Sequence, residues 1–296
     1  FSACPFSHFV KYGLRPGEPD AFELNGLSAG TVYHDLMMEL SIALSKPARA
    51  AGIAMTDPAS LWMTVSDRQL EAMVEQILTQ LSRTRYDGLL SFGPSQKYQT
   101  ERMHQVAFDF ARQMVRQVRR GTISNMYFEQ AFGRQAGNAL PPIVCPTPAG
   151  TVYIEGRIDR IDMLPGPGGD YAKIIDYKSG AQVLDRKKIE QGLALQLTTY
   201  LEGAMGKKDV KPAGMFYFRI REASLESDLP QMIAEAVSQE LEALLAKEYS
   251  LSGLAVDEPF ILNGIDSSIR ENHTSDIIGY KLQKNGKIRC NALISR

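Results

Sequence analysis

The stretch "KIIDYKSG", residues 173–180, is an apolar run that ends in an acidic and a basic side chain. Its isoleucine and tyrosine residues are typical of a β-strand, and the glycine marks its end. Asp176 and Lys178 stand two positions apart, so on a strand both side chains project from the same face. The stretch therefore predicts a buried strand whose last residues present a carboxylate beside an ammonium group.

Neighbouring segments predict further strands. Short runs rich in Tyr, Ile and Val lie at 123–133, 152–164 and 214–220. The turn residues "PGPGG" at 165–169 predict a hairpin between the run at 152–164 and the strand at 171–180. With a helix expected at about 186–204, the order is β-β-β-α-β, and we expect a sheet flanked by helices.

The first part of the chain is expected to be helical. Helical spacing of apolar residues is found at 1–14, 28–45, about 66–85 and about 95–120. Ser28 is expected to cap the second helix, and its buried face is expected to hold Val32, Leu36, Leu40 and Leu44. Residues 46–60 contain Pro47 and read as a loop, while Gly121 is expected to end the last helix.

This pattern divides the chain into three parts. Residues 1–122 are expected to form an N-terminal helical cap and residues 123–225 the core. Residues 226–296 are expected to form a helix, at about 229–249, and a tail that pack on the core. The segment 262–296 is polar and has no assigned structure.

Composition places the chain among ordinary globular proteins. Of 296 residues, 44% are hydrophobic and 23% charged, and the net charge of −1 argues against non-specific coating of nucleic acid by bulk charge. No apolar run approaches the roughly 20 residues that span a bilayer, and no signal peptide is visible. We therefore expect no membrane association. The first residue is Phe1, and we expect the chain to be part of a longer protein.

The cysteines are few and scattered. Cys4, Cys145 and Cys290 are odd in number and far apart, which excludes a disulfide framework and favours a reducing cytoplasm. The sequence contains no G-x-x-x-x-G-K-[ST] loop, so any ATP chemistry is expected to lie outside it.

A second acidic motif precedes the hairpin. "GRIDRID" holds Asp159 and Asp162, and we expect them to approach Asp176 only if the strand pairing is offset or bent. Converging carboxylates form a hard-ligand site suited to Mg²⁺ or Mn²⁺. With Lys178 beside it to orient water or stabilise charge on a phosphate, such a metal can support phosphodiester hydrolysis.

Four more residues point to the same chemistry. Glu129 in "MYFEQAFG" can supply another carboxylate, and His34 in "GTVYHDLM" can join oxygen ligands on a metal such as Mn²⁺. Gln196 and Tyr200 in "QLTTY" stand four residues apart, so they share a helix face and can contact a phosphate or a base. Each of these residues also has an ordinary structural interpretation, as a core histidine, an ion-pair partner or a cap on the sheet.

The combination "GRID…IIDYKSG…QLTTY", with "GTVYH" and "YFEQAFG" upstream, resembles the RecB-type nucleases of the PD-(D/E)XK superfamily. The opening "CPFSHFVKYGL" is similar to that of AddB-type nuclease domains. The resemblance covers nearly the whole chain and is weakest after about residue 222. It implies a restriction-endonuclease-like α/β fold, with a mixed sheet, flanking helices and an N-terminal helical cap.

The resemblance also implies roles for individual residues. Asp159 and Asp176 would hold the metal, with the carbonyl of Tyr177 and His34 as further ligands, and Glu129 would be an additional acid. Lys178 would activate water, and Gln196 and Tyr200 would position the substrate strand. Asp162 is expected to form a salt bridge with Arg160 or Arg157 instead of binding metal.

One departure concerns an iron–sulfur cluster. AddB-type domains clasp such a cluster with one cysteine near the start and three near the end. Cys4 matches the first and Cys290 stands alone at the end, so a four-cysteine cluster cannot be assembled here. The two residues are interpreted as remnants of that clasp, and Cys145 does not fit the pattern.

The implied function is metal-dependent exonuclease activity on DNA, with single-stranded ends as the expected substrate. The implied setting is double-strand-break repair by recombination, with an AddA-type helicase subunit and the rest of the parent chain as partners. Arg112, Arg116, Arg119 and Arg120 lie along one helix and form either a phosphate-contacting stripe or a solvated face. Two alternatives stay open: a stand-alone RecB-like exonuclease, and a non-catalytic DNA-binding scaffold with a degenerate site.

Overall fold

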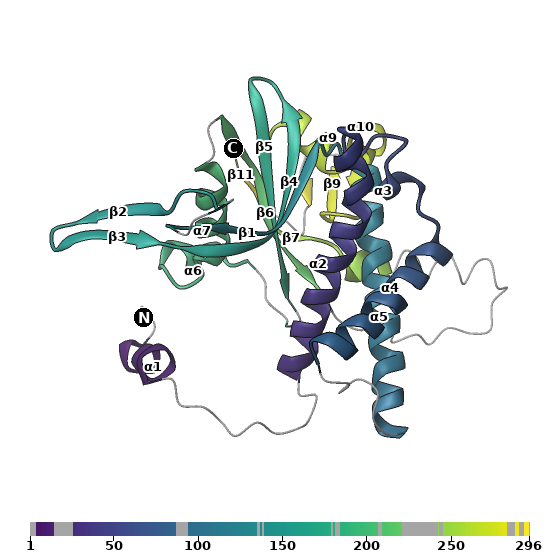
Figure 1. Cartoon of the computed structure of the whole chain (residues 1–296). Helices are drawn as coiled ribbons and strands as arrows, with labels where there is room; N and C mark the ends of the chain where they lie inside the picture. The colour runs from purple at the N-terminus through teal and green to yellow at the C-terminus, as the bar shows by residue number, and fades with distance from the viewer. Residues whose placement is uncertain are drawn as a thin grey trace.

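The computed structural model describes residues 4–14, 26–86, 94–134, 137, 139–178, 180, 184–206, 209–220, 242, 245–282, 288–289 and 293–295. Its centre is a six-stranded sheet (Figure 1) in the order β1 (Asn125–Phe132), β4 (Gly156–Gly166), β5 (Gly169–Lys178), β6 (Val210–Arg219), β7 (Ser252–Val256) and β11 (Leu293–Ser295). β4 is antiparallel to β1 and β5, whereas β5 is parallel to β6. The expected mixed sheet with flanking helices is confirmed.

The sheet is buried on both faces. Ile174 and Ile175 are neighbours on β5, so they point to opposite faces, and each is fully buried in a different hydrophobic cluster. One cluster lies under a helical layer and the other under α7 (Gln196–Met205). Burial of both faces explains why this strand is a continuous apolar run and does not alternate.

The helical layer consists of α2 (Gly26–Ala51), α3 (Leu61–Thr64), α4 (Asp67–Thr84) and α5 (Pro94–Arg120), which lie together on one side of the sheet (Figure 1). Val32, Leu36, Leu40 and Leu44 on α2 are fully buried, as expected. Helix α4 begins with a capping box between Ser66 and Gln69. This layer fixes α2 against the sheet.

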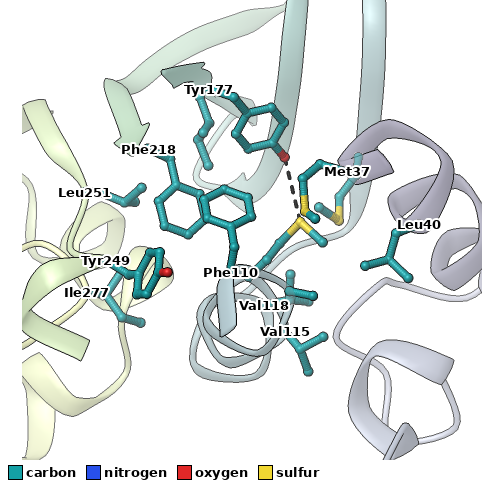
Figure 2. Close-up of a cluster of buried hydrophobic side chains, with 14 of the residues drawn as sticks. Met37, Leu40, Phe110, Val115, Val118, Tyr177, Phe218, Tyr249, Leu251 and Ile277 are labelled. Atoms are coloured by element: carbon teal, nitrogen blue, oxygen red, sulfur yellow. Dashed lines mark hydrogen bonds between the residues drawn. The ribbon is translucent and has the colours of Figure 1, made fainter. Parts of the chain in front are cut away.

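An aromatic cluster joins α5 to the centre of the sheet. Figure 2 shows Phe110 of α5 against Phe218 of β6, with ring centroids 4.1 Å apart. The Tyr177 ring packs edge-on against Phe110 at 5.6 Å, and its hydroxyl points at Met114 Sδ, 3.7 Å away. Tyr177 is therefore anchored in the core, and its packing fixes the position of the backbone at the adjacent Asp176.

The turn between β4 and β5 is a tight hairpin, as expected. Gly166 pairs with Gly169, and Gly168 and Gly169 have φ values of +74° and +136°. A Cβ atom on Gly169 would lie 2.6 Å from the carbonyl oxygen of Asp209. This position therefore requires glycine for its conformation and for the close approach of the backbone at Asp209.

Helix α2 is longer than expected at both ends. It begins at Gly26, so Ser28 lies inside it and is not its cap, and it continues through Pro47 to Ala51. Pro47 removes one backbone hydrogen bond, but Ala48 is fully buried beyond it and Arg49 donates to the carbonyl of Met126. Tertiary packing holds the last turn helical where a loop was expected.

Two other elements are divided where one was expected. The run at 152–164 is broken at Glu155: β3 (Gly150–Ile154) pairs with β2 (Ile143–Thr147) in a hairpin that projects from the body (Figure 1), and β4 follows. The helix at 186–204 is two helices, α6 (Arg186–Glu190) and α7. They are separated by a turn at Gly192, whose φ is +72°.

The last third of the chain completes the fold. Most of the helix expected at 229–249 lies outside the described residues, although 245–248 are helical. Beyond β7 come α9 (Pro259–Ile265), α10 (Ser268–Asn272) and a small sheet of β8 (Thr274–Ser275), β9 (Tyr280–Leu282) and β10 (Ile288–Arg289). At the other end, α1 (Pro5–His8) runs into a π-helical turn at Phe9–Leu14. None of the described helices is long and apolar enough to cross a membrane.

Candidate active site

Three acidic residues form a row across neighbouring strands. Pairing of Phe128 with Arg160 and of Gln130 with Ile158 leaves Glu129 of β1 opposite Asp159 of β4. Arg160 pairs with Ile175, which sets Asp159 beside Asp176 one step further along β4 and β5. An antiparallel hairpin brings the start of its first strand to the end of its second, so the expected need for an offset or a bend was wrong.

Helix α2 brings an imidazole to this row. His34 Nδ1 lies 3.3 Å from Glu129 Oε1, and His34 Nε2 lies 3.1 Å from Asp159 Oδ2. The hydrogen bond to Asp159 raises the pKa of His34 above its usual value, against the opposing effect of burial. The three residues offer one ligand atom each within 4.8 Å of one another, which is a metal-ligand spacing.

Glu129 has a backbone conformation that is rare for its residue type. Its φ is +49°, in the left-handed region, although it lies within a strand. Burial raises the pKa of its carboxyl group, and the nearby charge of His34 opposes the rise. Such strain persists where surrounding structure enforces it and is common at functional sites. Here the conformation accompanies a side chain that reaches His34 on α2.

Asp176 and Lys178 form the ion pair that the sequence suggested. Lys178 Nζ lies 2.7 Å from Asp176 Oδ2, and Asp176 is 1% exposed. Burial, and then the charge of Asp159, raise the pKa of Asp176 to about 6, although Lys178 and His34 act in the other direction. Burial and a neighbouring carboxylate thus disfavour the ionised form of Asp176, and a bound cation would stabilise that form.

Helix α7 closes the other side of the site. Gln196 Nε2 donates to Asp176 Oδ1 at 3.1 Å and to the Tyr200 hydroxyl at 3.0 Å. Burial raises the pKa of Tyr200 above its usual value, and the Gln196 hydrogen bond opposes the rise. The two side chains share one helix face, as expected, and they stand directly beside the carboxylate that pairs with Lys178.

Asp162 has a structural role. Its two oxygens accept from Arg160 Nε at 2.6 Å and Arg160 Nη2 at 2.8 Å, and Lys173 Nζ lies 2.7 Å from Oδ2. All three residues are fully buried. Burial opposes ionisation of Asp162, but Arg160 and Lys173 outweigh it and keep its pKa below the usual value. The expected salt bridge with Arg160 is confirmed, and the participation of Lys173 was not foreseen.

The arginine stripe of α5 is separate from this site. Arg112 pairs with Asp67 and Glu242, and Arg116 pairs with Asp276. Arg120 pairs with Asp266 and Asp276, and Arg119 donates to the carbonyl of Trp62. Acidic or carbonyl partners therefore engage all four guanidinium groups, and no contact joins them to the carboxylate row among the described residues.

The interpretation of Cys4 and Cys290 as remnants of an iron–sulfur clasp stays a prediction. Cys4 is exposed, just before α1, and Cys290 lies outside the described residues.

Two contacts of the site were not foreseen. Arg157 Nη1 lies 3.5 Å from Glu129 Oε2, and Lys178 Nζ lies 6.0 Å from the Tyr217 ring centroid. The i, i+2 spacing of Arg157 and Asp159 places both side chains on one face of β4 and is the signal that could have revealed the first contact. Tyr217 lies on β6, and only the register reveals the second contact.

The donor set fits a small hard or borderline cation. It consists of one imidazole nitrogen and oxygens of neighbouring carboxylates, which suits Mg²⁺ and Mn²⁺ better than a softer, thiolate-bound metal. Burial, and then the charge of Asp159, raise the pKa of Asp176, and a bound cation would stabilise the ionised form that both disfavour.

Comparison with known proteins agrees with this geometry. A family model described as the PD-(D/E)XK nuclease superfamily matches residues 1–264. The chain is also similar to proteins that are named as one subunit of an ATP-dependent helicase/deoxyribonuclease. Identity is 28% over 295 residues with that of Alkaliphilus oremlandii and 31% over 296 residues with that of Desulforudis audaxviator. The matches cover 97% and 98% of this chain but 24% of each relative, so the chain spans about a quarter of their length.

Proposed function

The chain belongs to the PD-(D/E)XK nuclease superfamily, and on that premise we propose that it hydrolyses phosphodiester bonds of DNA with a divalent metal ion, Mg²⁺ or Mn²⁺. The observation that carries the proposal is the convergence of Asp159, Asp176, Lys178 and His34 at one end of the sheet. A non-catalytic scaffold has no need of this set, and family membership does not favour it.

The proposed metal ligands are Asp159, Asp176 and His34, with Glu129 beside them. The backbone N–H of Tyr177 faces Asp159, and in a strand the C=O of the same residue points to the same side. This orientation supports the Tyr177 carbonyl as a further ligand. When bound, such an ion neutralises charge on the phosphate and lowers the pKa of coordinated water.

Lys178 is proposed to position the attacking water. Its ammonium group is held 2.7 Å from Asp176 Oδ2 and retains partial exposure, so it can donate to a water or a phosphate oxygen at the metal edge. The Gln196 amide and Tyr200 hydroxyl are proposed to contact the substrate strand on the α7 side. Arg112 and Arg116 are not proposed as contacts of the substrate strand, because acidic neighbours balance their charges.

The wider setting is proposed from the relatives' names. As part of a helicase/deoxyribonuclease subunit, the domain would act as an exonuclease on single-stranded ends that an AddA-type helicase partner produces. The rest of the parent chain would connect the two. Recombinational repair of double-strand breaks in the cytoplasm is the setting that fits this activity. Within this chain three cysteines cannot supply a four-cysteine cluster, so the proposed cofactor is the divalent ion.

The experiment that tests this proposal is cleavage of end-labelled single-stranded DNA in Mg²⁺ or Mn²⁺. Wild type is compared with Asp176→Ala and Lys178→Ala, and Arg134→Ala serves as an exposed control away from the row. We expect metal-dependent cleavage by wild type and the control, and none by the other two. Cleavage that survives both substitutions would indicate a different site. Folded wild type that binds DNA but never cleaves it would support the scaffold alternative.

A further inference from the structure

Two leucines beside the candidate active site are exposed to solvent. Leu193 and Leu195, in the turn between α6 and α7, are 46% and 48% exposed, although most large apolar side chains of the described residues are buried. Leu195 immediately precedes Gln196, whose side-chain amide donates to Asp176. The two leucines, here called the leucine lip, therefore lie within three residues of a side chain that contacts the carboxylate row.

The turn that carries the lip is held in a defined conformation. Leu193 N–H donates to the carbonyl of Lys188 at 2.8 Å, and Gly192 N–H donates to that of Ile189 at 2.9 Å. The positive φ of Gly192 closes the turn. Ile189 on one side and fully buried Leu197 on the other pack into the cluster beneath α7. The leucines thus face solvent because their neighbours anchor the backbone, and not because the segment lacks structure.

The charge beside the lip suits a polyanion. Lys187 and Lys188 on α6 are both exposed, and the structure shows no salt bridge to either ammonium group in the described part of the chain, although the Asp185 carboxylate accepts from both backbone N–H groups at the start of the helix. Helix α6 and the lip follow one another along the chain, so they combine basic and apolar side chains in the segment that leads into α7 and Gln196. A phosphate backbone can satisfy the lysines, but its oxygens offer nothing to the leucines.

We propose that Leu193 and Leu195 contact the faces of unpaired bases in the substrate strand and so make the site prefer single strands. The inference rests on the proposed nuclease function and deepens it by naming residues that select the substrate. In a duplex the base faces are stacked inside the helix. Phosphates would then reach the metal site, but no base face would cover the lip, which would remain exposed to water. An unpaired strand turns base faces outward, where apolar side chains can cover them.

The test separates bases from backbone. Binding is measured by fluorescence anisotropy, with Ca²⁺ in place of Mg²⁺, for a labelled oligothymidylate of about 12 nucleotides and for an abasic strand of the same length. The variants are Leu193→Ser with Leu195→Ser and, as a matched control, Val144→Ser with Val152→Ser. The control pair lies on the β2–β3 hairpin and is 53% and 51% exposed, so both double variants remove apolar groups of similar exposure.

We expect wild type to bind the oligothymidylate more tightly than the abasic strand. The leucine variant should lose about 10-fold in affinity for the oligothymidylate and none for the abasic strand, and the valine variant should match wild type. Equal binding of both strands by wild type would overturn the inference, as would an unchanged base preference in the leucine variant. In the latter case the lip would be a candidate protein-docking surface.

Failure of the two proposals is distinguishable because binding needs no turnover. If wild type never cleaves DNA in Mg²⁺ or Mn²⁺ but loses base-dependent binding in the leucine variant, the nuclease proposal fails and the lip remains a strand-binding element. If wild type cleaves and the leucine variant keeps its base preference, only the inference about the lip fails.

Discussion

Asp159 Oδ2 accepts a hydrogen bond from the backbone N–H of Tyr177, 2.9 Å away, across the open end of the β4–β5 hairpin. The same oxygen faces His34 Nε2 at 3.1 Å. One carboxylate therefore ties two strands together and also points to the proposed metal site. Structural and catalytic roles of Asp159 can be separated because only the second requires its charge.

Replacing Asp159 should separate these roles. Asp159→Asn removes the charge but keeps an oxygen that can accept from Tyr177 N–H, so metal-dependent cleavage should be lost while the hydrogen bond between the strands is kept. Asp159→Ala also leaves that N–H without its partner and should be less stable than Asp159→Asn by about 1 kcal/mol. Urea unfolding in EDTA measures the difference. Equal stability of the two variants would show that the hydrogen bond contributes nothing.

Removing the charge of Asp176 should stabilise the metal-free protein at neutral pH. Its pKa is about 6 in the folded state, above the usual 3.8, so wild type loses stability as pH rises from about 4 to 6 and does not regain it above. Asp176→Asn avoids that loss and should gain up to about 3 kcal/mol at pH 8. The gain should vanish below about pH 4. Thermal unfolding in EDTA at both pH values tests the sign, and a gain that is independent of pH would contradict it.

Metal affinity should decrease as the pH is lowered, because Asp176 becomes protonated. Binding requires the ionised form of Asp176, so affinity should drop about tenfold per unit as pH falls below 6. The raised pKa of His34 adds a second proton that binding must displace. Calorimetry with Mn²⁺ in two buffers of different ionisation enthalpy measures the released protons directly. Affinity that stays constant between pH 5 and pH 8 would exclude these ligands.

The buried pair of Asp162 and Arg160 should be essential for folding and not for chemistry. Asp162→Ala leaves Arg160 and Lys173 as uncompensated buried cations and should cost about 3–5 kcal/mol of unfolding free energy. Arg134→Ala, which breaks the exposed pair with Glu155, should cost less than about 1 kcal/mol. Chemical denaturation of both variants gives the comparison. Similar losses in the two would mean that burial does not set the cost.

The backbone strain at Glu129 should appear in a glycine–alanine comparison. Because its φ is +49°, Glu129→Gly should be more stable than Glu129→Ala by about 1 kcal/mol. The neighbouring Gln130 is not among the positive-φ residues of the described chain, so there the order should reverse, with alanine the more stable. Urea titrations of the four variants provide the measurement. The same order at both positions would show that the strain is not specific to Glu129.

Much of the fold could be predicted because its signals are local. The alternation of faces at Asp176 and Lys178, the turn at 165–169 and the apolar stripe of α2 all depend on spacing within a few residues. The boundaries failed where distant contacts decide them. Pro47 stays helical because Ala48 packs into the core, and the break at Glu155 separates a projecting hairpin from the sheet.

The site was predictable in its members but not in its geometry. A strand register is invisible in a single sequence, so the row of Glu129, Asp159 and Asp176 emerged only with the pairing of β1, β4 and β5. The burial of Lys173 was equally hidden, because its charge suggests an exposed side chain. Its partner Asp162 could be assigned an ion pair, but only the three-dimensional structure shows how many cations share it.

The hairpin also has a kinetic consequence. Asp159 and Asp176 are seventeen positions apart in the sequence, and the closure of one tight turn brings them together. Hairpins form within about 1–10 μs, whereas His34 must arrive from a helix more than a hundred residues away. Two repelling charges therefore meet early in folding, before the imidazole can join them. Near pH 8, refolding should be faster for Asp176→Asn, which removes one of the two charges, than for wild type, and stopped-flow refolding without metal would measure how much that early encounter slows the chain.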